Sequence, residues 1–241
     1  MSTLVFEFLA VFVIAILPQV LTGFYPDEMR TLLNNLPGNW KFITTLPGRL
    51  GSILLILFIG SLRQDDFQSI GLNWTKAASL STLLAAGALS VYLLLILFLA
   101  GKRSAKSQEE MAATRQRVLI GLRYSDTSTP WKRLAAYSDL WIAVIGEELV
   151  YRGYLILLMS RQTGTLYPWI AFSLALSILV HLYQGRTWKL ALGQMLIAAL
   201  FIFVVVITGS LMAAIIPHLV YNTVWLTRAF KKPSSRAEAT S

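Results

Sequence analysis

Long apolar stretches dominate this sequence and limit the folds that are open to it. A helix that crosses a bilayer needs roughly 20 mostly apolar residues. Of the 241 residues, 56% are hydrophobic and 14% are charged, whereas soluble domains carry about 25% charged residues. We therefore expect an all-α, polytopic membrane protein with about seven spans, which cover residues 4–24, 42–62, 77–100, 135–159, 166–183, 188–208 and 210–230.

The composition also excludes several kinds of site. The sequence has no cysteine, so it forms no disulfide, no thiolate metal site and no cysteine nucleophile. The formal net charge is +9, but the Lys and Arg residues lie in the gaps between the apolar stretches. Such a distribution sets membrane topology, and we expect no nucleic-acid partner.

The basic residues orient the chain across the membrane. Lys and Arg are dense between the first and second spans, between the third and fourth, and after the seventh. The opposite set of gaps contains only Arg63, Lys76 and Arg161. By the positive-inside rule, the N-terminus lies outside and the C-terminus lies in the cytoplasm. We expect a multi-pass integral membrane protein, in the plasma membrane if the source is prokaryotic.

Four segments follow from this pattern. Residues 1–100 form about three N-terminal spans, and residues 135–230 form a helical core that carries the candidate site. Residues 101–134 form a basic cytoplasmic loop, which fits an amphipathic helix on the membrane surface or a linker that sets topology. Residues 231–241 form a disordered tail.

Ionisable and amide side chains inside the predicted spans mark the candidate site. A charged residue at the centre of a bilayer costs at least ~2.5–3.5 kcal/mol, so it usually faces the protein interior and serves a function. The residues of this kind that we single out lie in the fourth, fifth and seventh spans: Glu147, Glu148, Arg152, His181, His218 and Asn222.

The spacing of these residues indicates which of them act together. Glu148 and Arg152 are four residues apart, share a helix face and can pair. Glu147 is turned away from Glu148 by about 100°. His218 and Asn222 are again four apart. A Glu–Arg pair can also be purely structural, but the full set indicates a hydrolytic site with a base, a second proton handler and oxyanion donors.

Three motifs in this region resemble those of a known family. "EELVYRG" matches the EExxxR motif, including Gly153, of the CAAX-protease and bacteriocin-processing (CPBP, or Abi) intramembrane proteases, which look like glutamate-type enzymes. "VHLYQG" resembles the end of the FxxxH motif, and "HLVYN" fits the HxxxN motif. The motifs occur in the family's order over residues 135–230. Ser177 stands where the family has Phe, and it lies one turn before His181, so a Ser–His dyad is an alternative.

The resemblance implies a role for each candidate residue. Glu147 would be the general base that activates water, and His181 would help to hold that water. His218 and Asn222 would stabilise the oxyanion that forms on the scissile carbonyl. Glu148 and Arg152 would hold the helix and orient the base.

We expect no cofactor and no metal at this site. Zinc is the alternative, with Glu147, His181 and His218 as ligands, but the sequence lacks an HExxH motif. Glu147 lies deep in its span and His181 lies near the end of its own. The two meet if the fourth helix extends beyond the bilayer or if the fifth runs deeper than hydropathy indicates.

The sequence thus predicts an intramembrane endopeptidase that cleaves a hydrophobic or lipidated membrane substrate. Within the resembled family, such activity covers CAAX-type cleavage and the processing of peptides and bacteriocins. The bilayer and the membrane-embedded substrate are the expected partners. A non-catalytic membrane binding or immunity protein is the first alternative. A transporter is the second, although the sequence shows no internal repeat of the kind common in transporters.

Overall fold

The described residues form long helices and contain no strand. The computed structural model describes residues 2–18, 40–62, 66–100, 129–183 and 188–230. Its elements are α1 (Ser2–Val11), the π-helical η1 (Phe12–Ile16), α4 (Trp40–Ser61), the 3₁₀-helical η2 (Asp66–Ile70), α5 (Trp74–Ala77), α6 (Leu80–Ala100), α8 (Pro130–Glu148), the π-helical η3 (Leu149–Leu158), α9 (Met159–Thr163), α10 (Tyr167–Tyr183), α11 (Trp188–Thr208) and α12 (Met212–Phe230).

These helices lie where the apolar stretches predict them. Most of the predicted basic loop (residues 101–128) and the predicted tail (231–241) lie outside the described residues. The helix that carries "EELVYRG" begins at Pro130, more than one turn before its expected start at residue 135. Thr129 caps it by accepting a hydrogen bond from the Lys132 amide, and Pro130 suits the first helical position. This helix is therefore longer than hydropathy alone indicates.

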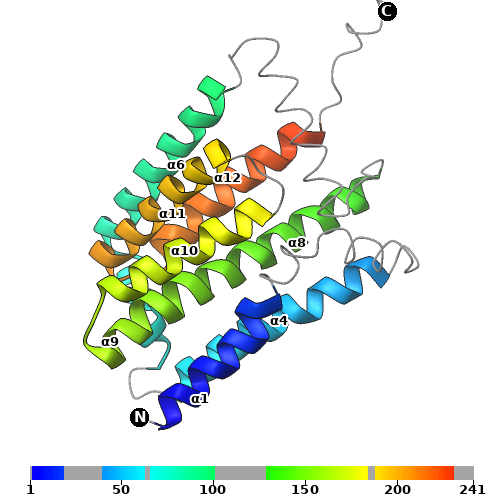
Figure 1. Ribbon diagram of the computed structural model, residues 1–241. Coiled ribbons are helices and arrows are strands. Elements are labelled where there is room, and N and C mark those ends of the chain that lie inside the picture. Colours follow the sequence, from blue (N-terminus) through cyan, green and yellow to red (C-terminus); the bar gives the residue numbers. More distant parts are fainter. Residues whose placement is uncertain (1, 19–39, 63–65, 101–128, 184–187, 231–241) are drawn as a thin grey trace, which may run out of the picture.

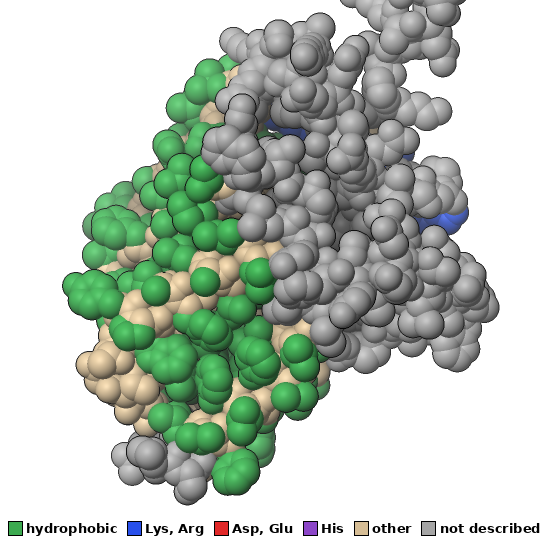
Figure 2. Space-filling view, in the orientation of Figure 1, with side chains coloured by type: hydrophobic (Ala, Val, Ile, Leu, Met, Phe, Trp, Pro, Cys, Tyr) green, Lys and Arg blue, Asp and Glu red, His purple; other side chains and the backbone are tan. Residues whose placement is uncertain are grey.

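The described surface is strongly apolar. Figure 2 shows hydrophobic side chains over most of the described part of one face, and Phe6, Phe58 and Phe203 are each at least 60% exposed. Among the described residues, Leu80–Leu99 is the one helical segment both long and apolar enough to cross a bilayer, and four further apolar helices are shorter. The crossing of the membrane by all seven predicted spans stays a prediction.

Helix α12 has a central place in the bundle. Figure 1 shows α6, α11, α12, α10, α8 and α4 running side by side with similar inclinations. Helix α12 packs against α6, α8 and α11, while α10 packs against α11 and η3. The segments α8, η3 and α9 follow one another without a break in helical backbone, so they form one rod from Pro130 to Thr163.

Polar pairs fix the register between α8 and α12. The hydroxyls of Tyr137 and Thr227 are 2.8 Å apart, and the indole of Trp141 donates to the Thr223 hydroxyl at 3.0 Å. Residue numbers rise along α8 while they fall along α12, so the two helices are antiparallel. Because each pair is one turn from the next, the two contacts together specify which residues of α12 meet the end of α8.

A buried ion pair holds α4 against α8. The Arg49 guanidinium donates to both the carboxylate and the backbone carbonyl of Asp139, and the Asp139 side chain is almost fully buried. Next to this contact, Gly146 faces Ile53 of α4. Asp139, which lies in an apolar helix, is thus accounted for by its structural pairing with Arg49.

The segment around η2 packs closely against the rod and the start of α12. Ile70 is fully buried, and the Gly71 carbonyl accepts a hydrogen bond from the Leu211 amide at 2.9 Å. Gly71 has φ = +81°, which favours glycine, and a β-carbon there would collide with Leu157. A β-carbon on Gly153 would lie 3.0 Å from the Ile70 carbonyl oxygen. The glycine that follows "EELVYR" is therefore required by backbone packing.

We predict that Gly153→Ala destabilises the protein, because a backbone carbonyl cannot move aside as a flexible side chain can. Gly87→Ala in α6 is the matched control, since a β-carbon there meets nothing within 4 Å. The measurement is the thermal midpoint of the detergent-solubilised protein followed by size-exclusion chromatography. Gly153→Ala should lower the midpoint, and Gly87→Ala should not. Equal midpoints for the two variants would contradict this account of Gly153.

Candidate active site

A buried charged cluster lies where α8 passes into η3, against α12. Glu148 is the last residue of α8 and has no solvent-exposed area. Its Oε1 accepts a hydrogen bond from Nη1 of Arg152 at 3.2 Å and lies 2.7 Å from Nδ1 of His218. Arg152 is also buried, and the His218 side chain is 14% exposed. Two of the three motifs therefore meet in space.

The pairing assigns the donor on the His218 ring. A carboxylate that already accepts from Arg152 is an acceptor, so Nδ1 of His218 donates to Glu148. The other ring nitrogen, Nε2, is then left for a substrate or a water molecule. A histidine whose ring is oriented by a carboxylate is a recurring element of hydrolytic sites.

The cluster leaves buried polar atoms without partners. Oε2 of Glu148 and Nε of Arg152 have no hydrogen-bond partner in the part of the chain that the structure describes. A buried, unsatisfied polar group costs about 1–3 kcal/mol. An ion pair that served only to join two helices would be more stable if these atoms had hydrogen-bond partners. The unsatisfied atoms therefore favour a functional cluster over a purely structural one.

Phe201 of α11 holds both partners of Glu148. Its ring stacks on the His218 ring, with centroids 4.9 Å apart and an angle of 27° between the planes. The Arg152 guanidinium carbon lies 5.5 Å from the centroid of the same ring, which is a cation–π distance. Phe201 is 2% exposed. Sequence reasoning missed this residue because nothing in an apolar helix distinguishes one Phe from another.

Glu147 and Asn222 lie next to the cluster but outside its hydrogen bonds. Glu147 is partly buried, interacts electrostatically with Tyr151 one turn along the helix, and makes no hydrogen bond or ion pair with any described residue. Asn222 is partly buried in α12, one turn beyond His218. Their polar atoms are available to other groups. The backbone of His181 belongs to α10, but its side chain lies outside the described part of the chain.

Ser177 lies on a part of α10 that approaches η3 closely. Its hydroxyl donates to the Ser173 carbonyl at 2.9 Å, and the Ser173 hydroxyl in turn donates to the Tyr151 carbonyl at 3.4 Å. Both serines are buried. The small serine side chains let α10 lie close to η3. The aromatic ring beside His218 comes from α11, as Phe201. The chain thus carries an aromatic side chain in the cluster although its FxxxH motif has lost the Phe.

The same residues include the ligands of the alternative zinc site. Among the residues that the structure describes, no three His, Asp or Glu side chains are grouped in a way that could hold a metal ion. Of the alternative zinc ligands, His218 uses one ring nitrogen on Glu148, Glu147 is partly buried, and the His181 side chain is not described.

Comparison with known proteins gives one family. Residues 129–224 match the family model described as "Type II CAAX prenyl endopeptidase Rce1-like". The matched segment runs from the cap of α8 into α12 and contains all six candidate residues. No curated protein and no solved structure matches the chain. The match confirms the resemblance drawn from the three motifs, and the family that it names is a protease family.

We predict that Phe201→Leu loosens the ring of His218. Leu keeps the apolar volume but removes the stacking and cation–π contacts, and each aromatic pair of this kind is worth about 0.5–1.5 kcal/mol. Phe203→Leu is the matched control, since Phe203 lies on the same helix and is 62% exposed. Diethyl pyrocarbonate should modify His218 severalfold faster in Phe201→Leu than in the wild type or the control, as measured by peptide mass spectrometry. Equal modification rates in the two variants would show that Phe201 does not hold the ring.

Proposed function

Since residues 129–224 match the Rce1-like family of type II CAAX prenyl endopeptidases, we propose that this protein is an intramembrane endopeptidase that hydrolyses its substrate with an activated water molecule. One observation carries the proposal beyond the family match. Glu147, with no ion pair among the described residues, lies next to a carboxylate that is fully buried and held by Arg152 and His218. The two neighbouring acids thus have different surroundings, which suits different roles.

Glu147 is the proposed general base. A base must reach a water molecule, and the partly buried Glu147 has a carboxylate that is not engaged by Arg or His. Glu148 is fully buried and already binds two partners, so it suits orientation better than proton transfer from bulk water. His181 is proposed to hold the same water, because α10 packs against η3.

His218 and Asn222 are the proposed oxyanion donors. Nδ1 of His218 is held by Glu148, and when Nε2 also carries a proton this nitrogen can donate to a developing negative charge. Asn222 follows one turn later on α12, so its amide lies on the same side of the helix. Donors of this kind are typically worth about 10²–10³ in kcat each.

The proposed step conserves atoms and charge. Glu147 takes a proton from water as the water oxygen bonds to the scissile carbonyl carbon, which forms a tetrahedral oxyanion. The carbon–nitrogen bond then breaks, and the leaving amine takes the proton from Glu147. The second proton of the water also passes to the amine, so the products are a new carboxylate at one end and a protonated amine at the other, and the protein returns to its starting state.

The proposed substrate is a membrane-associated protein with a prenylated or otherwise hydrophobic segment, which follows from the family description. The strongly apolar described surface suits a protein embedded in the bilayer with its substrate. We further propose seven membrane crossings, an outside N-terminus, a cytoplasmic C-terminus and a location in the plasma membrane if the source is prokaryotic. The distribution of Lys and Arg supports this orientation.

We predict that Glu147→Gln abolishes cleavage while the protein stays folded. Asp139→Asn is the matched control: it is the same acid-to-amide change on the same helix, at a carboxylate that pairs with Arg49. The measurement compares protein and peptide termini in membranes from cells with equal amounts of each variant. Termini produced by the wild type should vanish with Glu147→Gln and persist with Asp139→Asn, although the latter lowers thermal stability.

Identical terminal profiles for wild type, Glu147→Gln and Glu148→Gln, with all three proteins folded and abundant, would refute the proposed protease function. They would favour a non-catalytic membrane binding protein. If Glu148→Gln lost cleavage while Glu147→Gln kept it, Glu148 would instead be the general base.

We propose that no metal takes part. Part of the cluster is already paired within the protein, because Nδ1 of His218 donates to Glu148 and Glu148 also accepts from Arg152. We therefore predict that 1,10-phenanthroline at millimolar concentration leaves the cleavage rate of the purified protein unchanged. Loss of activity that added Zn²⁺ restores would contradict this and support the alternative ligand set of Glu147, His181 and His218.

A further inference from the structure

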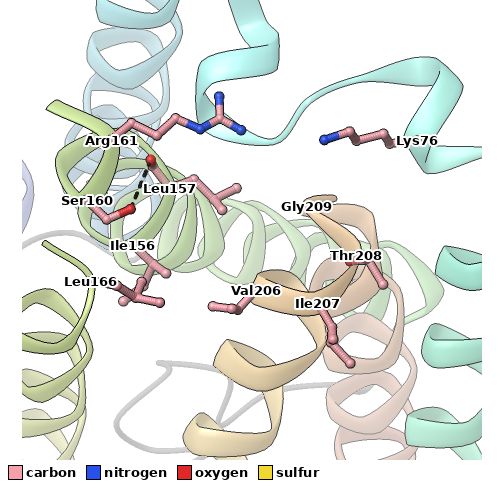
Figure 3. A pocket seen from close by; sticks show the side chains of 10 residues that line it. All are labelled: Lys76, Ile156, Leu157, Ser160, Arg161, Leu166, Val206, Ile207, Thr208 and Gly209. Atoms are coloured by element: carbon pink, nitrogen blue, oxygen red, sulfur yellow. Dashed lines mark hydrogen bonds between the residues drawn. The ribbon is translucent and has the colours of Figure 1, made fainter. Parts of the chain in front are cut away.

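A second polar region lies about two helical turns beyond Glu148 on the same rod. A cavity of about 340 Å³ opens there, between α5, η3, α9 and the end of α11 (Figure 3). Nothing in the proposed hydrolysis uses this cavity. Its lining combines two cations, Lys76 and Arg161, with the polar groups of Ser160 and Thr208 and with several apolar side chains.

The two cations come from distant parts of the chain. Lys76 belongs to α5 and Arg161 to α9, and in Figure 3 their charged groups approach the same space from opposite sides. Neither side chain makes a hydrogen bond or an ion pair with any residue that the structure describes. Two like charges that face one space repel each other, so an anion between them would be stabilised.

The wall below the cations is apolar and continues onto the outer surface. Ile156, Leu157, Leu166, Val206 and Ile207 line it. Ile207 is 61% exposed and Val206 is 39% exposed, so the cavity merges with the apolar face of α11. A free phosphate ion would gain nothing from such a wall, whereas a hydrocarbon chain would be held against it.

Neighbouring residues support a position of the two cations at the depth of lipid headgroups. Lys76 lies one turn before Leu80, where the helix long enough to cross a bilayer begins. Trp74 and Tyr167 lie at the same end of the bundle, and each is 83% exposed. Exposed Trp and Tyr are typical of the boundary between membrane and water, where the phosphates of lipids lie.

Gly209, at the end of α11, lies directly beside the ammonium group of Lys76. A β-carbon on Gly209 would lie 2.9 Å from the Lys76 ammonium nitrogen, and Gly209 has φ = +61°. The glycine therefore ends α11 and leaves room for Lys76 to cross its C-terminal end. The turn between α11 and α12 is thus shaped to accept a cation over it.

From these observations we infer that the cavity binds the phosphate headgroup of an anionic phospholipid. Arg161 and Lys76 bind the phosphate oxygens, since guanidinium and ammonium groups both suit this ligand. One acyl chain lies against Val206 and Ile207. The Ser160 hydroxyl donates to the Leu157 carbonyl at 3.3 Å, so the two cations supply the binding donors.

The test measures lipid binding to the purified full-length protein by native mass spectrometry, with phosphatidylglycerol as the probe and phosphatidylcholine as the zwitterionic comparison. The test variant is Lys76→Gln/Arg161→Gln. The control is Lys132→Gln/Arg133→Gln, which removes the same charges from the start of α8, and circular dichroism checks the fold of both. A cation near a lipid surface is worth about fivefold in affinity. We therefore expect the test variant to bind phosphatidylglycerol about 25-fold more weakly and the control to bind it as wild type does.

Equal phosphatidylglycerol binding by wild type and the test variant would overturn the inference, and so would an equal loss in the control. Equal affinity of the wild type for phosphatidylcholine would show that the anionic headgroup is not recognised. Inorganic phosphate provides the last arm: if millimolar phosphate displaces the lipid from wild type, the cavity binds a soluble anion and the assignment to a lipid fails. These measurements do not involve peptide cleavage, so their outcome is independent of the proposed protease function.

Discussion

A carboxylate with no exposed surface imposes the tightest constraint on this structure. Moving an ion from water into the protein interior costs several kcal/mol, and partners must offset this cost. Glu148 obtains Arg152 from its own helix and His218 from α12. The first partner follows from helical geometry, but the second requires α12 to meet the end of α8 in one register. The placement of α12 within the bundle therefore depends on this contact.

Other contacts hold the same arrangement from a distance. Tyr137 and Trp141 bind hydroxyl groups of α12 along the helix that leads to Glu148, which fixes the antiparallel register before the charged cluster is reached. Further along the rod, Gly153 lies against Ile70 and Leu211, next to the start of α12. The rod also becomes π-helical directly after Glu148, and π-helical turns are frequent at functional sites. The charged cluster thus lies on rigid elements.

The same rod carries two regions with different chemistry. The cluster around Glu148 is buried and uses its charges on one another, which suits a protected reaction. The cavity at Lys76 and Arg161 is open and has no described partner for its charges, which suits an external ligand. The depth of each region in the bundle explains the contrast, because a charge near the headgroups keeps contact with water while a charge in the core must find a protein partner.

Local spacing and hydropathy determined much of this protein from the sequence. Apolar stretches gave the positions of the described helices, and the four-residue separation of Glu148 and Arg152 gave their pairing, because both depend on residues near one another in the chain. Three motifs indicated a resemblance to the family whose model matches residues 129–224. Only the tertiary structure decided that His218 binds Glu148, that Phe201 holds His218 and Arg152, and that Gly153 faces the Ile70 carbonyl. Each of these contacts joins helices far apart in sequence, and such contacts depend on the register and rotation of whole helices, which hydropathy does not encode.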